Sequence, residues 1–145
     1  MSHSPGIDLN PQMRAALARS AELGASFGPP AAGIARVREL AVLARRYWNE
    51  GGPEVESIEE RTIPGPTREV PVVVYRPRAS DRPLPVFLYL YGGGFKIGNQ
   101  WANDRQMREL VQAWSGIVIS ADCLHVPEHV FSSAVVKCSN VATNK

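Results

Sequence analysis

The sequence predicts an α/β fold, and three observations support this prediction. The first third of the chain has two stretches with apolar residues at helical spacing. Two runs rich in β-formers follow, separated by a turn signal, and then comes a strand, a helix and another strand. Such a succession implies a right-handed crossover between parallel strands. The chain has 145 residues, fewer than the roughly 200–250 that complete α/β folds commonly use, so we expect an incomplete fold.

The two N-terminal helices have clear boundaries in the sequence. Asn10 can cap the first helix, Pro11 suits its first turn, and Gly24 stands where it should end. In the second helix, apolar residues recur at helical spacing from Ile34 to Trp48. Gly51-Gly52-Pro53 then terminates it.

The sheet is expected to begin with a hairpin. Residues 55–63 alternate loosely, Pro64-Gly65-Pro66 signals a turn, and the run from Val70 to Tyr75 is rich in β-branched residues. The stretch from Leu84 to Tyr91 is nearly continuously apolar. Such a run is typical of a strand that is covered on both faces.

A third helix and a last strand complete the predicted βαβ unit. Gly116 should close the helix, residues 116–121 should form a second buried strand, and a short helix is expected after Ser132. The helix is identified by four apolar residues at positions i, i+3, i+4 and i+7, which are Met107, Leu110, Val111 and Trp114.

Charge and cysteine content exclude several kinds of partner. The formal net charge is +2, and the nearest basic cluster (Arg36, Arg38, Arg45 and Arg46) is expected to be the solvated face of a helix. We therefore predict no nucleic-acid binding. No secretory signal or membrane span is visible, and Cys123 and Cys138 have no metal-ligand or disulfide spacing. We predict a cytoplasmic protein without a bound metal.

The glycine triplet at residues 92–94 has the clearest chemical meaning, because it directly follows a predicted strand. Glycines reach unusual backbone conformations, so their N–H groups can converge on one point. Acyl transfer needs such donors for the oxyanion, and removing one typically costs roughly 3–4 kcal/mol of transition-state stabilisation. Elsewhere a glycine triplet would favour a loop without a ligand. Ligands of open α/β sheets, however, bind outside the carboxyl ends of strands, where this triplet stands.

Two motifs in this order resemble the hormone-sensitive-lipase-like family of α/β-hydrolases. The segment Tyr91-Gly92-Gly93-Gly94-Phe95 is similar to the family's His-Gly-Gly-Gly-Phe loop, and residues 122–129 are similar to its Asp-Tyr-Arg-Leu-Ala-Pro-Glu-His segment. The resemblance covers almost the whole chain. It implies an N-terminal helical cap at residues 1–52. At 53–145 it implies the first part of an α/β-hydrolase sheet domain, truncated before the turn that carries the nucleophile.

The resemblance also implies roles for the loop residues. Gly93 and Gly94 would supply the oxyanion-hole N–H groups, Gly92 would allow the turn, and Tyr91, in place of the family's histidine, would support the loop. The changes at residues 123–126 remove a tyrosine and an arginine expected to order the wall behind the loop. The implied activity is hydrolysis of short- to medium-chain acyl esters, a small-molecule substrate, with no cofactor.

The nucleophile, acid and base of the family are expected to lie beyond this chain, so we predict that the chain alone is inactive. Gly24-Ala25-Ser26-Phe27-Gly28 matches Gly-x-Ser-x-Gly literally, but it follows a helix and precedes two prolines. Ser26 is therefore expected at a helix end. Cys123 lies near His125 and His129 in sequence, and we expect a packed thiol there, not a nucleophile.

Two other functions remain open. One is a catalytically inactive, truncated or degenerate hydrolase that at most binds a small acyl ligand or a partner chain. The other is a phosphate-binding loop, although no Lys-Ser/Thr pair follows the glycines and no Gly-x-Gly-x-x-Gly is present. The family also places a further strand beside residues 84–91. Without that strand we expect an exposed sheet edge and self-association.

Overall fold

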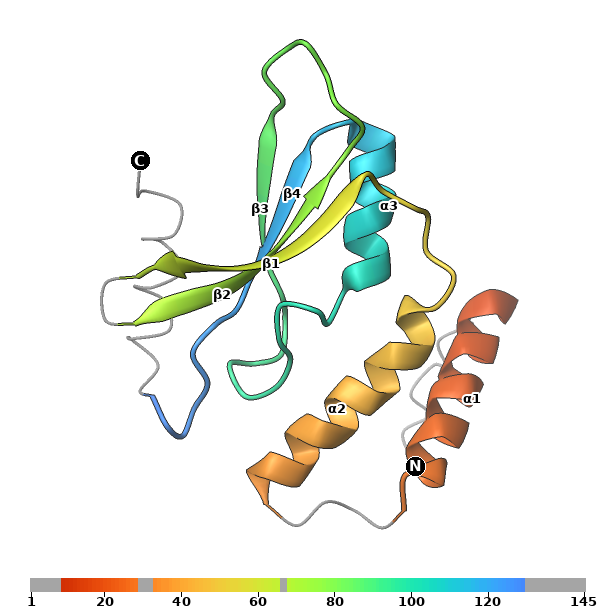
Figure 1. Cartoon of the computed structure of the whole chain (residues 1–145). Coiled ribbons are helices and arrows are strands. Elements are labelled where there is room, and N and C mark those ends of the chain that lie inside the picture. The colour runs from red at the N-terminus through yellow and green to blue at the C-terminus, as the bar shows by residue number, and fades with distance from the viewer. Residues whose placement is uncertain (1–8, 29–32, 66–67, 130–145) are drawn as a thin grey trace.

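The structure of the chain, a computed structural model, describes residues 9–28, 33–65 and 68–129. Its strands form one mixed sheet in the order β1-β2-β4-β3. Figure 1 shows α3 lying against this sheet, whereas α1 and α2 lie below it. The α/β fold is confirmed. The elements are α1 (Pro11–Ser26), α2 (Ile34–Asn49), β1 (Ser57–Pro64), β2 (Glu69–Arg76), β3 (Val86–Leu90), α3 (Asp104–Trp114) and β4 (Ile117–Ala121).

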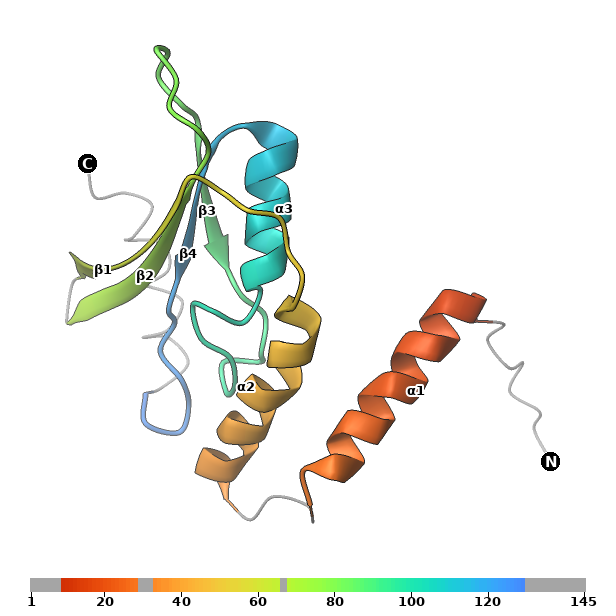
Figure 2. The same cartoon turned by 45° about the vertical axis from the view of Figure 1, so that its right-hand side comes forward.

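The first helix begins where the sequence predicts and ends later. The Asn10 Oδ1 atom accepts a hydrogen bond from the Gln12 N–H at 2.8 Å, so the predicted cap is present. The helix continues two residues past Gly24, to Ser26. No residue of α1 is buried, and Figure 2 shows α1 standing away from the sheet beside α2.

The second helix is tied to the sheet domain at its carboxyl end. Arg108 of α3 donates to the carbonyl oxygens of Asn49 and Gly52, each at 3.2 Å, and pairs with Asp104 at 2.7 Å. The bond to Asn49 satisfies a carbonyl group that the end of a helix would otherwise leave without a partner. α2 therefore has a fixed position next to α3.

The sheet contains the predicted hairpin and the predicted parallel pair. β1 and β2 run antiparallel, with Ser57 opposite Arg76. β3 and β4 run parallel, with Phe87 opposite Val118. β2 also pairs antiparallel with β4, which makes the sheet mixed.

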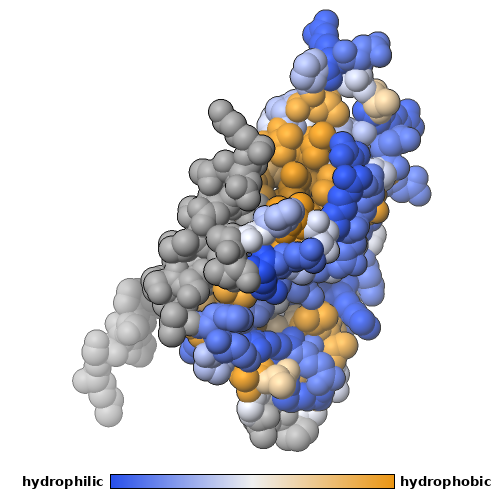
Figure 3. Space-filling model, turned by 60° about the vertical axis from the view of Figure 1, so that its left-hand side comes forward, coloured by the Kyte–Doolittle hydropathy of each residue, from blue (hydrophilic) through white to orange (hydrophobic). Residues whose placement is uncertain are grey.

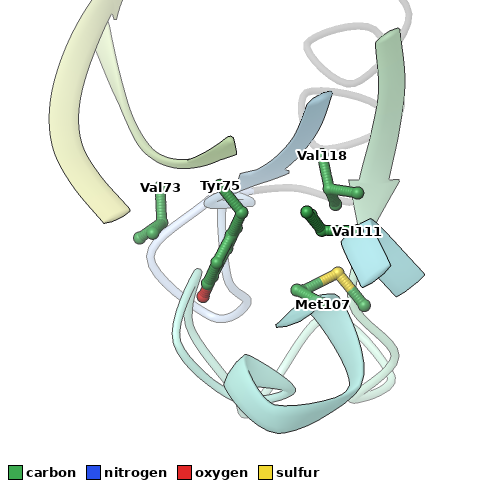
Figure 4. Packing of buried hydrophobic residues seen from close by; sticks show 5 residues of the cluster. All are labelled: Val73, Tyr75, Met107, Val111 and Val118. Atoms are coloured by element: carbon green, nitrogen blue, oxygen red, sulfur yellow. The ribbon is translucent and has the colours of Figure 1, made fainter. Parts of the chain in front are cut away.

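The core lies between α3 and the two central strands (Figure 4). The buried residues of the cluster that faces α3 have 0–3% of their surface exposed. A second cluster lies on the opposite face of the sheet and consists of Val70, Val72, Val74 and Ala121. Burying side chains of this size stabilises a fold by roughly 1.5–3 kcal/mol each. The α3-facing cluster consists of Val73, Tyr75, Met107, Val111 and Val118.

The expectation that β3 is covered on both faces is wrong for this chain. Val86 is 58% exposed, Phe87 41% and Leu90 38%. β3 has one partner strand, β4, among the described residues. Figure 3 shows a hydrophobic area just below the hydrophilic loop at the top of the molecule, at the height of β3 in Figure 1.

The end of α3 also differs from the prediction. Ser115, not a glycine, has the left-handed conformation that ends the helix, with φ of 56°. Gly116 serves another purpose, because a Cβ there would lie 2.6 Å from the Trp114 ring. Gly116 therefore permits close packing at the start of β4.

Two remaining predictions concern membrane spans and the C-terminal helix. No helix within the described residues has both the length and the apolar character needed to cross a membrane. The short helix expected after Ser132 falls outside the described residues.

Candidate functional site

The glycine loop and the segment that follows β4 lie together. β3 and β4 are adjacent and parallel, so the segments that leave their carboxyl ends emerge at the same edge of the sheet. The N–H of Val126 donates to the carbonyl of Phe95 at 2.8 Å. The two motifs that carry the family resemblance are therefore in direct contact.

The three glycines of the loop have different geometric needs. The Gly93 carbonyl accepts from the N–H groups of Lys96 at 3.0 Å and Ile97 at 3.2 Å, and a Cβ on Gly93 would lie 1.9 Å from the Ile97 carbonyl oxygen. Gly94 has φ of +58°, a conformation that favours glycine. Gly92 faces open space. The tight turn thus requires glycine at 93, favours it at 94, and leaves 92 unconstrained by its described neighbours.

Tyr91 connects the ends of the two parallel strands. Its side chain is buried, and its hydroxyl donates to Asp122 Oδ1 at 2.7 Å. The Tyr91 hydroxyl oxygen also accepts from the Cys123 N–H at 3.2 Å and lies 3.0 Å from His125 Nε2. Because a hydroxyl has one hydrogen and two lone pairs, this arrangement assigns the proton of the neutral imidazole to Nε2.

Burial sets the protonation states of this cluster. It raises the pKa of Tyr91, and the hydrogen bond to Asp122 adds to the effect. Burial also lowers the pKa of His125, partly offset by the Asp122 charge. Asp122 in turn pairs with Arg68 at 3.2 Å. Tyr91 is therefore neutral, and its role in supporting the loop stays a prediction.

Gly98 ends the glycine-rich loop that begins at Gly92. It has φ of +105°, and a Cβ there would lie 2.6 Å from the Tyr91 ring. The ring of Tyr91 can occupy its buried position only because residue 98 has no side chain. The signal in the sequence was the glycine itself, at the end of the loop.

Arg38 corrects the expectation that the arginines of α2 only face solvent. Its guanidinium donates to both carboxylate oxygens of Glu128, at 2.8 and 2.7 Å. It also donates to the carbonyl oxygens of Lys96 at 2.8 Å and Val126 at 2.9 Å. One side chain from the N-terminal helical region thus holds both the glycine loop and the segment after β4.

A cavity of about 280 Å³ lies between α2 and the glycine loop. Gly92 and Gly98 line it from the loop, Trp101 lines it from the turn before α3, and Arg45 and Arg46 line it from α2. Its volume is near the lower end of the roughly 300–1,000 Å³ typical of ligand pockets. The space suits a small molecule.

Neither alternative nucleophile is placed for catalysis. Ser26 is exposed at the end of α1, and its hydroxyl donates to the Leu23 carbonyl at 2.7 Å. Cys123 is 8% exposed and packs with Tyr91 and Ala102. Among the described residues no cluster of three or more His, Cys, Asp or Glu could hold a metal ion.

Comparison with solved structures identifies the class of protein. No protein-family model matches the sequence. The chain is similar to an esterase from Pyrobaculum calidifontis, with 31% identity over 92% of this chain and 41% of that one, and a TM-score of 0.77. An α/β-hydrolase from the Lake Arreo metagenome matches with 28% identity over 89% and 42% of the two chains, and a TM-score of 0.78. A thermostable carboxylesterase from a metagenomic library gives 27% identity, 72% and 35% coverage, and a TM-score of 0.66.

The fold is therefore part of an α/β-hydrolase fold, and the chain spans less than half the length of the solved proteins that it matches. The resemblance to the hormone-sensitive-lipase-like carboxylesterases is confirmed for the part of the fold that the chain covers.

Proposed function

We propose that this chain is the front part of a carboxylic-ester hydrolase that acts on short- to medium-chain acyl esters. In the complete enzyme a serine would attack the ester carbonyl. The N–H groups of Gly93 and Gly94 would stabilise the tetrahedral oxyanion. Tyr91 and Gly92 would support the loop, and water would release the acid. Residues 1–52 would act as the cap over the substrate and residues 53–145 as the first part of the sheet domain.

One observation supports this proposal most strongly. At the carboxyl end of a parallel strand, the loop makes a turn that is sterically closed to any residue but glycine at 93. The chain that carries this loop is 31% identical to an esterase. The nucleophile, acid and base would come from outside these 145 residues, so we expect the isolated chain to leave esters unhydrolysed.

A chimera tests the proposal. The matched front part of the Pyrobaculum calidifontis esterase would be replaced by this chain, and hydrolysis of p-nitrophenyl butyrate would be measured. We expect an active chimera. Gly93→Ala keeps its N–H group, but the new Cβ would clash with the Ile97 carbonyl oxygen and displace the turn. We therefore expect kcat to fall by about 100- to 1,000-fold, as when one oxyanion donor is lost. Gly24→Ala is the control, because its Cβ would contact nothing. A folded chimera without esterase activity would contradict the proposal.

A second candidate function is binding without turnover. The cavity beside Gly92 is formed by this chain's own residues, so it needs no catalytic triad to receive a small acyl ligand. Saturable binding of such a ligand to the 145-residue chain, together with an inactive chimera, would favour this function. We further propose a cytoplasmic location and self-association through β3.

A further inference from the structure

The cavity beside the glycine loop combines an apolar wall with a basic rim. Val42 and Ile97 line it from opposite sides, α2 and the loop, and Trp101 closes the end near α3. Arg45 and Arg46 lie on the same cavity. None of the described residues that line it is acidic.

The two arginines differ from the others on their helix. Arg36 pairs with Glu39 at 2.7 Å, and Arg38 pairs with Glu128. Arg45 and Arg46 have no hydrogen bond or ion pair within the described part of the chain. Position near the carboxyl end of α2 gives a cation a modest benefit from the helix dipole, which accounts for a positive charge but not for two on a cavity wall.

We propose that this cavity binds esters with a second, ionised carboxylate, namely monoesters of short dicarboxylic acids. A guanidinium matches a carboxylate in geometry and charge, and can bind it through two parallel hydrogen bonds. The ester group would lie toward Gly92, the methylene chain against Trp101, and the free carboxylate at Arg45 and Arg46. This inference rests on the proposed ester-hydrolase function, for which it names the substrate class.

The test is a titration of the ¹⁵N-labelled 145-residue chain, followed by NMR. Monomethyl glutarate is compared with methyl pentanoate, which has a methyl group in place of the carboxylate. We expect the amides of Gly92 and Gly98 and the Trp101 indole to shift with both ligands. The charged ester should bind about tenfold more tightly at low salt, and the advantage should shrink as salt is added.

Variants separate charge from shape. Arg45→Gln with Arg46→Gln should reduce the affinity ratio of the two ligands from about tenfold to near one. Replacing both residues by lysine keeps the charge but loses the bidentate geometry, and should give an intermediate ratio. Arg82→Gln is the control, since Arg82 is also exposed but lies outside this cavity, and it should leave the ratio unchanged.

Equal binding of both ligands, or an equal loss in Arg82→Gln, would overturn the inference. The chimera then distinguishes this result from failure of the proposed function. A chimera that hydrolyses neutral esters as well as dicarboxylic monoesters overturns only the charge preference. An inactive chimera, in a chain that still binds monomethyl glutarate more tightly, overturns only the ester-hydrolase function.

Discussion

The two parallel strands are both short and mostly apolar, but their environments differ. β4 lies between β2 and β3, and Val118 and Ala121 are fully buried. β3 pairs only with β4 among the described strands, and Val86 is 58% exposed. Phe87 and Val118 are register partners in this pair, yet one is 41% exposed and the other 0%.

The difference shows that an apolar strand is not buried by its sequence alone. A sheet strand needs a neighbour on each side and cover on each face, and both depend on the rest of the chain. The solved proteins that resemble this chain are more than twice its length. Among the described residues β4 has a strand on each side, whereas β3 has one neighbour, so a strand of the same apolar kind becomes an edge.

The largest expected effect is the difference in stability between the variants Val118→Asp and Phe87→Asp. Val118→Asp would bury a carboxylate without a partner, which costs on the order of 5 kcal/mol and is comparable with the stability of a small domain. Phe87→Asp loses an edge-to-face contact with Trp114 at 6.1 Å, worth about 1 kcal/mol. Urea unfolding followed by circular dichroism should show a missing transition for the first variant and a modest shift for the second.

The Phe87→Asp variant also tests self-association. A charge on an exposed edge strand opposes pairing with another chain, so Phe87→Asp should lower the sedimentation coefficient toward that of a monomer. If the unsubstituted chain is already a monodisperse monomer, the proposed edge contact is wrong. If Phe87→Asp unfolds the chain as Val118→Asp does, then β3 is buried as deeply as β4.

The loop after β3 provides the second contrast. Gly93→Ala should lower the free energy of unfolding by about 3 kcal/mol, because the new Cβ clashes with the Ile97 carbonyl. Gly92→Ala should change it by no more than about 0.5 kcal/mol, because nothing lies within 4 Å of the added atom. Equal losses of stability in the two variants would show that the loop has another geometry.

The tyrosine between the two strand ends provides the third contrast. Tyr91→Phe removes the hydroxyl that serves Asp122 and the Cys123 N–H, and leaving these groups without it should cost about 1–2 kcal/mol. Tyr89→Phe is the matched control, because its hydroxyl has no hydrogen bond within the described residues. Equal midpoints in thermal unfolding for the two variants would remove Tyr91 from its bracing role.

Local signals predicted most of the fold. Asn10 and Pro11 mark the start of α1, periodicity places α2 to within one residue, and the turn signal begins at Pro64, the last residue of β1. Gly116 was misassigned because its role is close packing against Trp114. Packing of that kind depends on a neighbour that no local pattern describes.

The site was harder to predict than the fold. The glycine triplet was identified from its place directly after a predicted strand, and its oxyanion-hole role stays a prediction. The contact of Arg38 could not be identified in this way, since its partner Glu128 is 90 positions away in sequence. The changes at 123–126 suggested a less ordered wall, yet the Tyr91 hydroxyl holds that wall through the Cys123 backbone and His125. Such bonds follow from the meeting of β3 and β4, not from residue type.

The smallest expected effect concerns pH and the segment after β4. Arg38 lowers the pKa of Glu128 from 4.5 to about 2 through their hydrogen bonds. Because the pKa is lower in the folded state, this pair contributes stability above pH 4.5 and loses it as the pH falls toward 2. Glu128 is half exposed, so solvent screening keeps the contribution small. The side-chain ¹³C shift of Glu128 should follow this titration.

Arg38→Gln should move the Glu128 midpoint up toward 4.5. Arg36→Gln should not, because Arg36 pairs with Glu39 on its own helix. The Val126 amide, which donates to the glycine loop, should also exchange with solvent about tenfold faster in Arg38→Gln, since the local opening needs less free energy without the clamp. An unchanged Glu128 midpoint would mean that α2 does not hold this segment. The contact between the loop after β3 and the segment after β4 would then depend on the bond from Val126 to Phe95.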